Sequence, residues 1–311
     1  MRTQRDTLVT TPDVVDRPSQ VPPLHAVDPA VATYRALYDR AADRCSRVIT
    51  HTYSTSFSWA IRCLHRDLRR PIHAIYGFVR LADEIVDTFA GSAQAGMLTR
   101  FQEETHRAIA EGISIHPVLH SFQWAVRTYG IERALIDRFL HSMGMDLTER
   151  QYDDDRFAEY ILGSAEVVGL MCLRVFCARD DARYERLVPP AMRLGAAFQK
   201  INFLRDLRHD HIALGRSYFP GIDLSRFDED VKRRLEADIA EDLRAGSAGI
   251  AELPRSARLG VTLACRYFRA VLRKIARTPA DTIMQRRIRI SNGHKLLILA
   301  GAVLFPWNGR S

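Results

Sequence analysis

The sequence predicts an all-α protein. Apolar residues recur at helical spacing through most of the 311-residue chain, and Pro and Gly separate the periodic stretches. No segment combines strict alternation of apolar and polar residues with turn signals at its ends, so the chain offers no convincing β-strand. With 47% hydrophobic and 26% charged residues, its composition is that of a globular protein.

Six helices are expected in the first half of the chain, separated by helix-breaking residues. They cover residues 31–50, 54–66, 71–89, 95–111, 116–128 and 131–147. Pro71 and Pro117 mark helix starts, because proline is tolerated in a first turn, where its missing N–H has no partner to lose. Gly91 and Gly130 separate neighbouring helices, because glycine readily adopts the backbone conformation that ends a helix.

Five longer helices are expected in the second half. They cover residues 155–178, 183–210, 228–250, 254–277 and 280–304. Pro189–Pro190 is typical of a helix start, so the second of these is expected to begin later than residue 183. Gly215 and Pro220 separate it from the next helix, and the last helix is expected to break around Asn292–Gly293.

The chain is expected to form a single catalytic helical domain over residues 30–311. Residues 1–29 are rich in Pro, Thr and Asp without apolar periodicity, so we expect a flexible N-terminal extension. That stretch has no apolar segment typical of a secretory signal. The cysteines are odd in number and lack metal-binding spacing, which predicts a reduced, cytoplasmic protein. They are Cys45, Cys63, Cys172, Cys177 and Cys265.

The net charge of +8 suits an anionic partner, either nucleic acid, a membrane surface or an anionic substrate. A solvated basic surface explains it equally well. Because the basic residues are spread out and no zinc-finger or RNP-like motif is present, no nucleic-acid partner is expected. The apolar run "LLILAGAVLFPW" is too short to span a bilayer, and it predicts a core helix or a peripheral contact with the inner face of the membrane.

A stripe of polar side chains runs along the expected helix 71–89. Its members recur at i, i+4, i+7 and i+11, as Tyr76, Arg80, Asp83 and Asp87. At about 100° per residue, this spacing places them within an arc of roughly 60°. Taken alone, the pattern is equally typical of an ordinary amphipathic surface helix.

A second polar stripe lies inside the apolar stretch "LGAAFQKINFLRDLRHD". Its members are Gln199, Asn202, Asp206 and Asp210, within an arc of roughly 80°. Apart from Lys200, almost every other direction around its first half is apolar, and a helix that is apolar on nearly all sides should be buried. The stripe is therefore expected to line an internal cavity, with a hydrogen-bonded polar core network as the alternative.

Together the two stripes predict a cation site. Each contains two Asp residues four positions apart, which share a helix face. Four carboxylates facing one cavity would repel each other unless cations lie between them. All-oxygen ligation suits Mg²⁺, with Mn²⁺ as an alternative, and such ions bridge to substrate phosphates. Arg80 and Arg205 stand beside the carboxylates and suit phosphate oxygens, so the pattern indicates a magnesium–diphosphate site in a helical bundle.

Three segments resemble motifs of the squalene/phytoene synthases, the head-to-head prenyl synthases. They are "YSTSFSWAIRCL" (53–64), "AIYGFVRLADEIVD" (74–87) and "FQKINFLRDLRHDHIALGRSYFP" (198–220). The third is similar to the family's Q-x-x-N-x-x-R-D-x-x-x-D helix followed by a Gly-Arg-x-Tyr-x-Pro turn. The resemblance covers roughly residues 35–300, and the stretches "YILGSAEVVGLMCLRVF" and "RRIRISNGHKLL" are most similar to bacterial phytoene synthases.

The resemblance implies an isoprenoid synthase-type helical bundle with a central apolar cavity. It implies that two allylic prenyl diphosphates bind, that one ionises, and that the second attacks it to give a cyclopropylcarbinyl (prephytoene) diphosphate. This intermediate ionises again and rearranges. In phytoene synthases a proton is then lost, whereas squalene synthases use NADPH, so no NADPH is expected here. The cavity must exclude water, which would quench the carbocation.

The resemblance also implies roles for particular residues. The implied Mg²⁺ ligands are Asp83, Asp87, Asn202, Asp206 and Asp210. Arg80, Arg205 and Gln199 would grip diphosphate oxygens. The positions implied near the substrate are Ser54, Ser56, Phe57 and Tyr76, with Leu162, Val168 and Phe198 as further cavity lining or as core packing.

The chain departs from the family pattern at three places. Tyr53 stands where many members carry His, Thr55 where many carry Lys, and Ser164–Ala165–Glu166 where V-A-G is common. Glu166, in an apolar stretch, is a candidate substrate-binding group, metal ligand or proton acceptor. The alternative is a structural pair with an arginine.

Three functions remain open from the sequence. The first is phytoene synthase, which joins two geranylgeranyl diphosphates in carotenoid biosynthesis. The second is squalene or dehydrosqualene synthase, which uses farnesyl diphosphate; the length of the cavity decides between them. The third is a non-catalytic scaffold or assembly factor of the same fold, which would have no need of carboxylates facing a cavity.

Overall fold

The computed structural model describes residues 29–304 except 90, 92, 179 and 213. By their internal contacts, Met1–Tyr38 and Asp39–Ser311 form two units. Of the first unit, residues 29–38 are described, and they form the start of helix α1. The expected extension over 1–29 lies almost wholly outside the described residues, so this boundary and the single domain over 30–311 stay predictions.

The all-α prediction is confirmed. The α-helices are α1 (Pro29–Tyr53), α2 (Thr55–Arg62), α3 (Arg66–Asp87), α4 (Gln94–Glu111), α5 (Pro117–Tyr129), α6 (Arg133–Thr148), α7 (Asp154–Ile161), α8 (Val167–Cys177), α9 (Asp181–Ile212), α10 (Glu229–Ala248), α11 (Arg255–Ala276), α12 (Ala280–Ile283) and α13 (Asn292–Leu304). Short 3₁₀ turns cover Leu224–Arg226 and Gly249–Glu252. In the described chain, β-type pairing is limited to an isolated bridge between Gln151 and Ser217.

Local sequence explains several helix ends. Ser54 caps α2, because its hydroxyl oxygen accepts the backbone N–H of Phe57 at 3.1 Å. Pro117 lies in the first turn of α5, as predicted. α4 and α5 end at Gly112 and Gly130, whose φ angles of 70° and 67° favour glycine.

Two helices begin earlier than the prolines predict. α3 starts at Arg66, so Pro71 lies inside it. α9 starts at Asp181 and continues through Pro189–Pro190, so the expected later start is wrong. Proline removes helical hydrogen bonds, but α9 packs against both α8 and α10, and this tertiary packing sustains the helix across the two prolines.

The predicted helix over 155–178 contains a π-helical turn, Leu162–Glu166, between α7 and α8. The turn lies where α6 approaches closely: a Cβ atom on Gly163 would stand 2.7 Å from the carbonyl oxygen of Arg138. A π turn inserts an extra residue and so rotates the following helix relative to the preceding one. Tyr160 before the turn and Val168 after it both face the central cavity.

The predicted helix 280–304 is interrupted earlier than expected. After α12 the chain runs in turns and then extended until α13 begins at Asn292. The reason is a period-two pattern: Ile288 and Ile290 are buried at 4% and 6% exposure, whereas Arg287 and Arg289, which alternate with them, are exposed. This extended segment runs along the mouth of the cavity described below.

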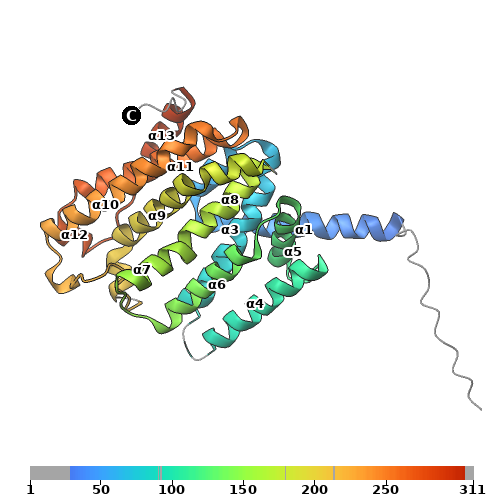
Figure 1. Cartoon of the computed structure of the whole chain (residues 1–311), viewed down its shortest axis with the longest axis horizontal. Coiled ribbons are helices and arrows are strands. Elements are labelled where there is room, and N and C mark those ends of the chain that lie inside the picture. Colours follow the sequence, from blue (N-terminus) through green and yellow to red (C-terminus); the bar gives the residue numbers. More distant parts are fainter. Residues whose placement is uncertain (1–28, 90, 92, 179, 213, 305–311) are drawn as a thin grey trace, which may run out of the picture. The chain divides into compact units, whose positions relative to one another are not determined.

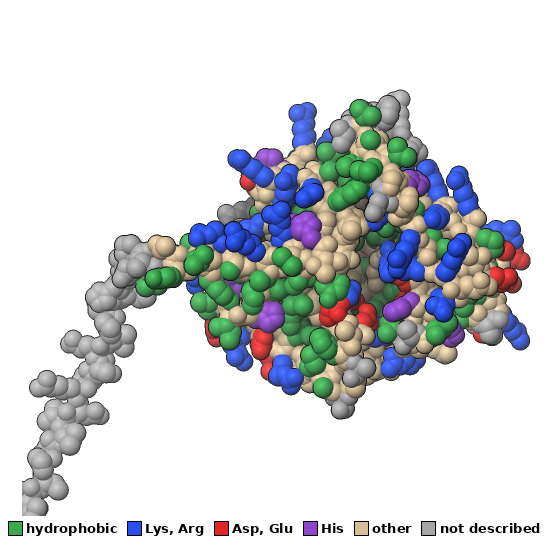
Figure 2. Space-filling model, turned by 180° about the vertical axis from the view of Figure 1, so that it is seen from behind, with side chains coloured by type: hydrophobic (Ala, Val, Ile, Leu, Met, Phe, Trp, Pro, Cys, Tyr) green, Lys and Arg blue, Asp and Glu red, His purple; other side chains and the backbone are tan. Residues whose placement is uncertain are grey.

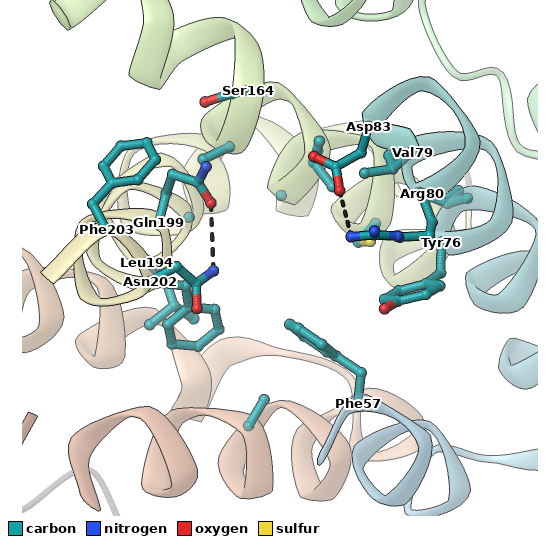
Figure 3. A pocket seen from close by; sticks show the side chains of 18 of the residues that line it. Phe57, Tyr76, Val79, Arg80, Asp83, Ser164, Leu194, Gln199, Asn202 and Phe203 are labelled. Atoms are coloured by element: carbon teal, nitrogen blue, oxygen red, sulfur yellow. Dashed lines mark hydrogen bonds and ion pairs between the residues drawn. The ribbon is translucent and has the colours of Figure 1, made fainter. Parts of the chain in front are cut away.

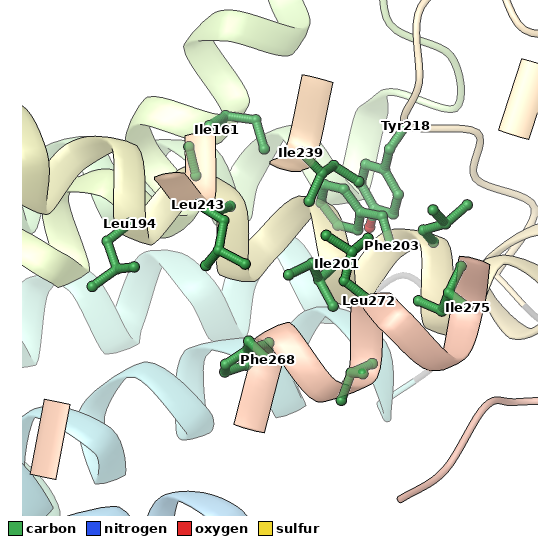
Figure 4. Packing of buried hydrophobic residues seen from close by; sticks show 14 of the residues in the cluster. Ile161, Leu194, Ile201, Phe203, Tyr218, Ile239, Leu243, Phe268, Leu272 and Ile275 are labelled. Atoms are coloured by element: carbon green, nitrogen blue, oxygen red, sulfur yellow. The ribbon is translucent and has the colours of Figure 1, made fainter. Parts of the chain in front are cut away.

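Within the second unit, helices pack side by side as a bundle around two groups of buried apolar residues (Figure 1). One group is centred on α9, α10 and α11 and includes Ile201, Ile239 and Phe268 (Figure 4). The other joins α3, α5 and α6, where Phe78 stacks on Phe122 with ring centroids 3.9 Å apart. A cavity remains between the two groups.

Asp154–Cys177 is long and apolar enough to cross a membrane by length and composition alone, among the described residues searched. Since 56% of its most apolar window is buried and its side chains line the central cavity, it is a core helix. The C-terminal run differs from the expected core helix. In α13, Leu296 and Leu297 are 55% and 72% exposed, although Ala302 is buried.

Candidate active site

A cavity of about 940 Å³ opens between α2, α3, α8, α9 and α11. This volume is near the upper end of the usual range for ligand pockets. Figure 2 shows the hollow on one face of the molecule, with acidic and basic side chains at its rim. The charged lining lies at the C-terminal ends of α3 and α9, and the lining towards their N-terminal ends is apolar.

The first polar stripe faces this cavity. All of its members line the cavity, namely Tyr76, Arg80, Asp83 and Asp87. Figure 3 shows Tyr76, Arg80 and Asp83 on one wall, with Phe57 near them. Phe57 also lines the cavity, and its ring centroid lies 5.9 Å from that of Tyr76. The reading of α3 as an ordinary surface helix is therefore wrong for this face.

The second polar stripe faces the same cavity from the opposite wall. Its members, Gln199, Asn202, Asp206 and Asp210, all line the cavity. The Asn202 amide donates to the Gln199 side-chain oxygen at 3.4 Å (Figure 3). The predicted convergence of the two stripes on one cavity is thus present in the fold, while the chemical roles of these residues stay predictions.

Burial and neighbouring carboxyl groups raise the pKa of two of these aspartates. Burial, and then the neighbouring Asp87, raises the pKa of Asp83 to about 7. Burial, and then Asp206 and Asp87, raises the pKa of Asp210 to about 8. Burial and the neighbouring carboxylates thus both disfavour ionisation of Asp83 and Asp210.

These donors fit Mg²⁺. Carboxylate and amide oxygens are hard ligands, and Mg²⁺ is held in proteins through one or two carboxylates together with waters and substrate phosphates. Within the part of the chain that the structure describes, no group of three or more His, Cys, Asp or Glu side chains is arranged to hold a metal ion by itself. A metal ion held by these Asp residues would therefore need further ligands.

Arginines occupy the space beside these carboxylates. Arg80 pairs with Asp83 and with Glu84 on its own helix. Arg205 donates to both oxygens of Asp206, at 3.1 and 2.6 Å. Arg287, from the extended segment before α13, also pairs with Asp206. Both walls therefore present guanidinium groups at the polar end, as anion binding requires.

Three candidate residues lie outside the cavity lining. Ser54 caps α2, and Ser56 is half-buried in the same helix. Glu166 does not line the cavity. Its pKa is raised by burial and then by Asp242, and Lys200 opposes the rise. Its surroundings are thus a network of charged side chains between α9 and α10, which supports the structural alternative.

The expected apolar lining is present except at one position. Phe57, Val168 and Phe198 line the cavity. Leu162 does not, and packs instead against the buried group around α3 and α6. The π turn that begins at Leu162 accounts for the difference, because it changes which residues face inward.

Sequence reasoning missed a buried polar cluster behind the aspartates. The Asp146 carboxylate, 3% exposed, accepts hydrogen bonds from the hydroxyls of Tyr160 and Tyr218 at 2.8 and 3.0 Å. Arg216 donates to Asp87 at 2.7 Å and to the Tyr218 hydroxyl at 3.2 Å. Burial raises the pKa of Asp146 to about 6, although Arg216 lowers it.

A signal for this cluster was present in the sequence. Arg216 and Tyr218 belong to the Gly-Arg-x-Tyr-x-Pro turn, and Tyr160 opens "YILGSAEVVGLMCLRVF". An acid at position 146, within an apolar stretch of the predicted helix 131–147, also needs a partner. The cluster joins the ends of α3, α6, α7 and α9 at the polar end of the cavity and fixes the position of Asp87.

Comparison with known proteins agrees with this geometry. The family model for squalene/phytoene synthase matches residues 50–294. The chain is 26% identical over 274 residues to a 15-cis-phytoene synthase of Pantoea ananas, covering 80% of this chain and 87% of the relative. It is 27% identical over 286 residues to a phytoene synthase of Mycobacterium tuberculosis, covering 84% and 90%.

Solved structures show the same fold. A dehydrosqualene synthase in complex with a ligand superposes with a TM-score of 0.75 at 20% identity, covering 86% of this chain and 98% of that one. A squalene synthase from Alicyclobacillus acidocaldarius gives 0.67 at 24% identity, covering 78% and 95%. With a matched family model across most of its length and this fold, the chain belongs to the squalene/phytoene synthase family of prenyltransferases.

Proposed function

We propose that the protein is a phytoene synthase that joins two geranylgeranyl diphosphates head to head. The observation that carries the proposal is the arrangement of two Asp pairs with Arg80 and Arg205 at one end of a long apolar cavity. The relatives named phytoene synthase support the choice of product. Carotenoid biosynthesis is the setting that such a product implies.

At the polar end, the residues would hold the diphosphate groups. Asp83, Asp87, Asp206 and Asp210, with the Asn202 amide oxygen, are the proposed ligands of Mg²⁺. Bound there, Mg²⁺ would neutralise the charge that develops on a departing diphosphate. Arg80, Arg205 and Gln199 would bind and orient diphosphate oxygens, as their position on both walls allows.

At the apolar end, the cavity would hold the prenyl chains away from water. From Asp206 to Leu187 the α9 wall runs for nineteen residues, about 28 Å at about 1.5 Å per residue. Side chains such as Ile75, Val168 and Phe198 surround this length. A dry enclosure of this kind protects a carbocation from capture by water.

The proposed reaction balances without a reductant. The first bond formation releases one diphosphate and one proton and gives the cyclopropylcarbinyl diphosphate. The second ionisation releases the other diphosphate, and loss of a second proton gives phytoene. Formation of squalene would instead require a hydride from NADPH. The proposed reaction to phytoene uses no NADPH.

The test is incubation of the purified protein with Mg²⁺ and either geranylgeranyl or farnesyl diphosphate, without NADPH, followed by mass spectrometry of the hydrocarbons. A C40 product from the C20 substrate is expected. A C30 product formed only from the C15 substrate would move the assignment to squalene or dehydrosqualene synthase, the activity named for the superposed structures. No product from either substrate with folded protein would favour the non-catalytic scaffold.

We also propose peripheral contact with a membrane, from which long prenyl substrates come and to which the product goes. The support is the exposed apolar face of α13, with Leu296 and Leu297, and the positive net charge of the chain. An apolar helix face together with basic residues suits an anionic bilayer surface.

A further inference from the structure

Two arginines, Arg205 and Arg287, pair with the carboxylate of Asp206. Its Oδ1 accepts from Nε of Arg205 at 3.1 Å and forms an ion pair with Nε of Arg287 at 2.6 Å. Its Oδ2 accepts from an Nη2 atom of each, at 2.6 Å from Arg205 and 3.0 Å from Arg287. A carboxylate has about four lone-pair sites, and these three hydrogen bonds and the close ion pair lie where a metal ion would have to bind.

The two arginines differ in how they are held. Arg205 belongs to α9, beside Asp206 itself, and its side chain is 16% exposed. Arg287 comes from the extended segment before α13, and its side chain is 49% exposed. The Arg287 side chain would therefore lose less buried surface than the Arg205 side chain on moving from Asp206 to solvent or to another anion.

The backbone under Arg287 is fixed. Ile288 and Ile290 are buried in the group around α9, α10 and α11, and Lys274 donates to the carbonyl oxygen of Arg289 at 2.6 Å. Arg287 and Arg289 both line the cavity. The side chain of Arg287 can therefore exchange partners at the polar end while its backbone stays in place.

We propose that Arg287 is a positioning residue that couples cation binding to diphosphate binding. Without ligand it neutralises Asp206 and keeps a cation from that carboxylate. A diphosphate that enters the polar end is a more highly charged acceptor for the bidentate guanidinium group, so Arg287 moves from Asp206 to the diphosphate. The freed carboxylate can then bind the cation.

This inference rests on the proposed function in taking Asp206 as a metal ligand. By linkage, diphosphate must raise the affinity for the cation by the same factor as the cation raises the affinity for diphosphate. A site of this kind stays largely without metal until substrate arrives. Removal of Arg287 should therefore strengthen binding of the cation alone and weaken the coupling.

The experiment measures Mn²⁺ binding to the full chain by electron paramagnetic resonance, without and with inorganic pyrophosphate at matched total concentrations. Because the total concentrations are the same for every variant, the Mn²⁺–pyrophosphate complex that forms free in solution affects all variants alike. For Arg287→Gln we expect Mn²⁺ alone to bind about tenfold tighter than to the unmodified protein, within the range typical of couplings between sites. Enhancement by pyrophosphate should shrink by a similar factor.

Two further variants sharpen the test. Arg287→Lys keeps the charge but loses the bidentate geometry, so its affinity for Mn²⁺ should lie between those of the unmodified protein and Arg287→Gln. Arg286→Gln removes the same charge from the neighbouring exposed position, which is outside the cavity lining, and should bind Mn²⁺ like the unmodified protein. Circular dichroism spectra of all variants check the fold.

The outcomes separate the coupling from the function. If Arg287→Gln binds Mn²⁺ alone no more tightly than the unmodified protein, or if Arg286→Gln changes the affinity equally, the coupling through Arg287 is wrong while the metal site stands. If the folded, unmodified protein binds no Mn²⁺ even with pyrophosphate, the metal assignment in the proposed function fails first.

Discussion

At the residue scale, the site combines groups that a sequence can reveal with groups that it cannot. Aspartates spaced four apart on a helix share a face, and this geometry alone brings Asp83 and Asp87, or Asp206 and Asp210, together. That both pairs face one cavity follows from the packing of α3 and α9, which are far apart in sequence. The partnership of Arg287 with Asp206 depends on an extended segment that the helical pattern did not predict.

Replacing Asp83 or Asp206 by Asn should abolish most turnover without unfolding the chain. Each change removes a charged oxygen ligand and keeps the size of the side chain. Loss of such electrostatic stabilisation lowers kcat by about 10²–10³-fold in other enzymes, and we expect at least that. Product formation from geranylgeranyl diphosphate and thermal unfolding are measured in parallel.

Asp67→Asn is the matched control, because Asp67 lies on the same helix with its side chain 71% exposed. It should keep nearly full activity. Full activity in either cavity variant would remove the metal assignment, whereas loss of structure in both would call for the ligand-binding measurements above.

At the element scale, the helices were predictable because their signals are local. Gly112 and Gly130 end helices by their own backbone preference, and Ser54 caps α2 within three residues. The π turn was not predictable, since it arises where Gly163 packs against the backbone of α6. The passage of α9 through Pro189–Pro190 likewise depends on neighbours that supply packing where hydrogen bonds are lost.

α3 carries an acid-sensitive contact. His73 is 8% exposed and its Nδ1 lies 3.0 Å from the hydroxyl of Thr50. Because that hydroxyl donates to the carbonyl oxygen of Ser46, its oxygen is free to accept from Nδ1–H of a neutral His73. Burial, and then His51, lowers the pKa of His73 from 6.5 to about 4.

The free energy of unfolding should therefore fall as the pH drops from about 6.5 to 4. In this window the unfolded chain binds a proton at His73 that the folded chain does not, so stability is full above pH 6.5 and is lost towards the folded pKa. The shift corresponds to about 3 kcal/mol at most. In urea unfolding, the free energy of unfolding should depend more steeply on pH for the unmodified protein than for His73→Gln.

His65→Gln, at an exposed position just before α3, serves as the control and should keep the pH dependence of the unmodified protein. Equal pH dependence in the unmodified protein and His73→Gln would show that His73 is not the acid-sensitive group.

At the scale of the whole molecule, the fold class was predictable from periodicity, and the cavity was inferred from polar groups in an apolar helix. Its length and shape were not, because they depend on how α2, α8, α9 and α11 close around it. The family resemblance supplied the chemistry that geometry alone leaves open. Ser54, Ser56 and Glu166 lie outside the cavity lining, and their roles stay predictions.

The apolar end of the cavity should limit the chain length of the substrate. Ala191 lines the cavity about 22 Å along α9 from Asp206, at about 1.5 Å per residue. In Ala191→Phe the added ring would occupy space that the end of a C20 chain needs. We expect kcat/KM for geranylgeranyl diphosphate to fall by about tenfold or more, with a smaller effect for farnesyl diphosphate.

The measurement with farnesyl diphosphate is the control for the measurement with geranylgeranyl diphosphate. If Ala191→Phe lowers kcat/KM equally for both, the change has disturbed the fold or the polar end, and Ala191 does not set the length.

Membrane contact is testable through α13. Flotation with anionic liposomes should recover the unmodified protein, and Leu297→Glu should reduce recovery, since burying one leucine contributes about 1.5–3 kcal/mol. Ile115, 96% exposed between α4 and α5, offers the control Ile115→Glu, which should float normally. No flotation of the unmodified protein would contradict the membrane proposal.

The hollow core also gives the protein a characteristic response to hydrostatic pressure. Unfolding lets water fill internal space, so the volume of the system falls, in proportion to the space eliminated. The proposed function requires a dry apolar end, so part of the cavity of about 940 Å³ should contribute a negative volume change of unfolding. A non-reactive prenyl diphosphate analogue that fills the hollow should make this volume change smaller, measured as the slope of unfolding free energy against pressure. An unchanged slope with bound analogue would mean that the hydrocarbon lies elsewhere. A reduced slope would make the volume change of unfolding a direct measure of how much of the cavity the substrate fills.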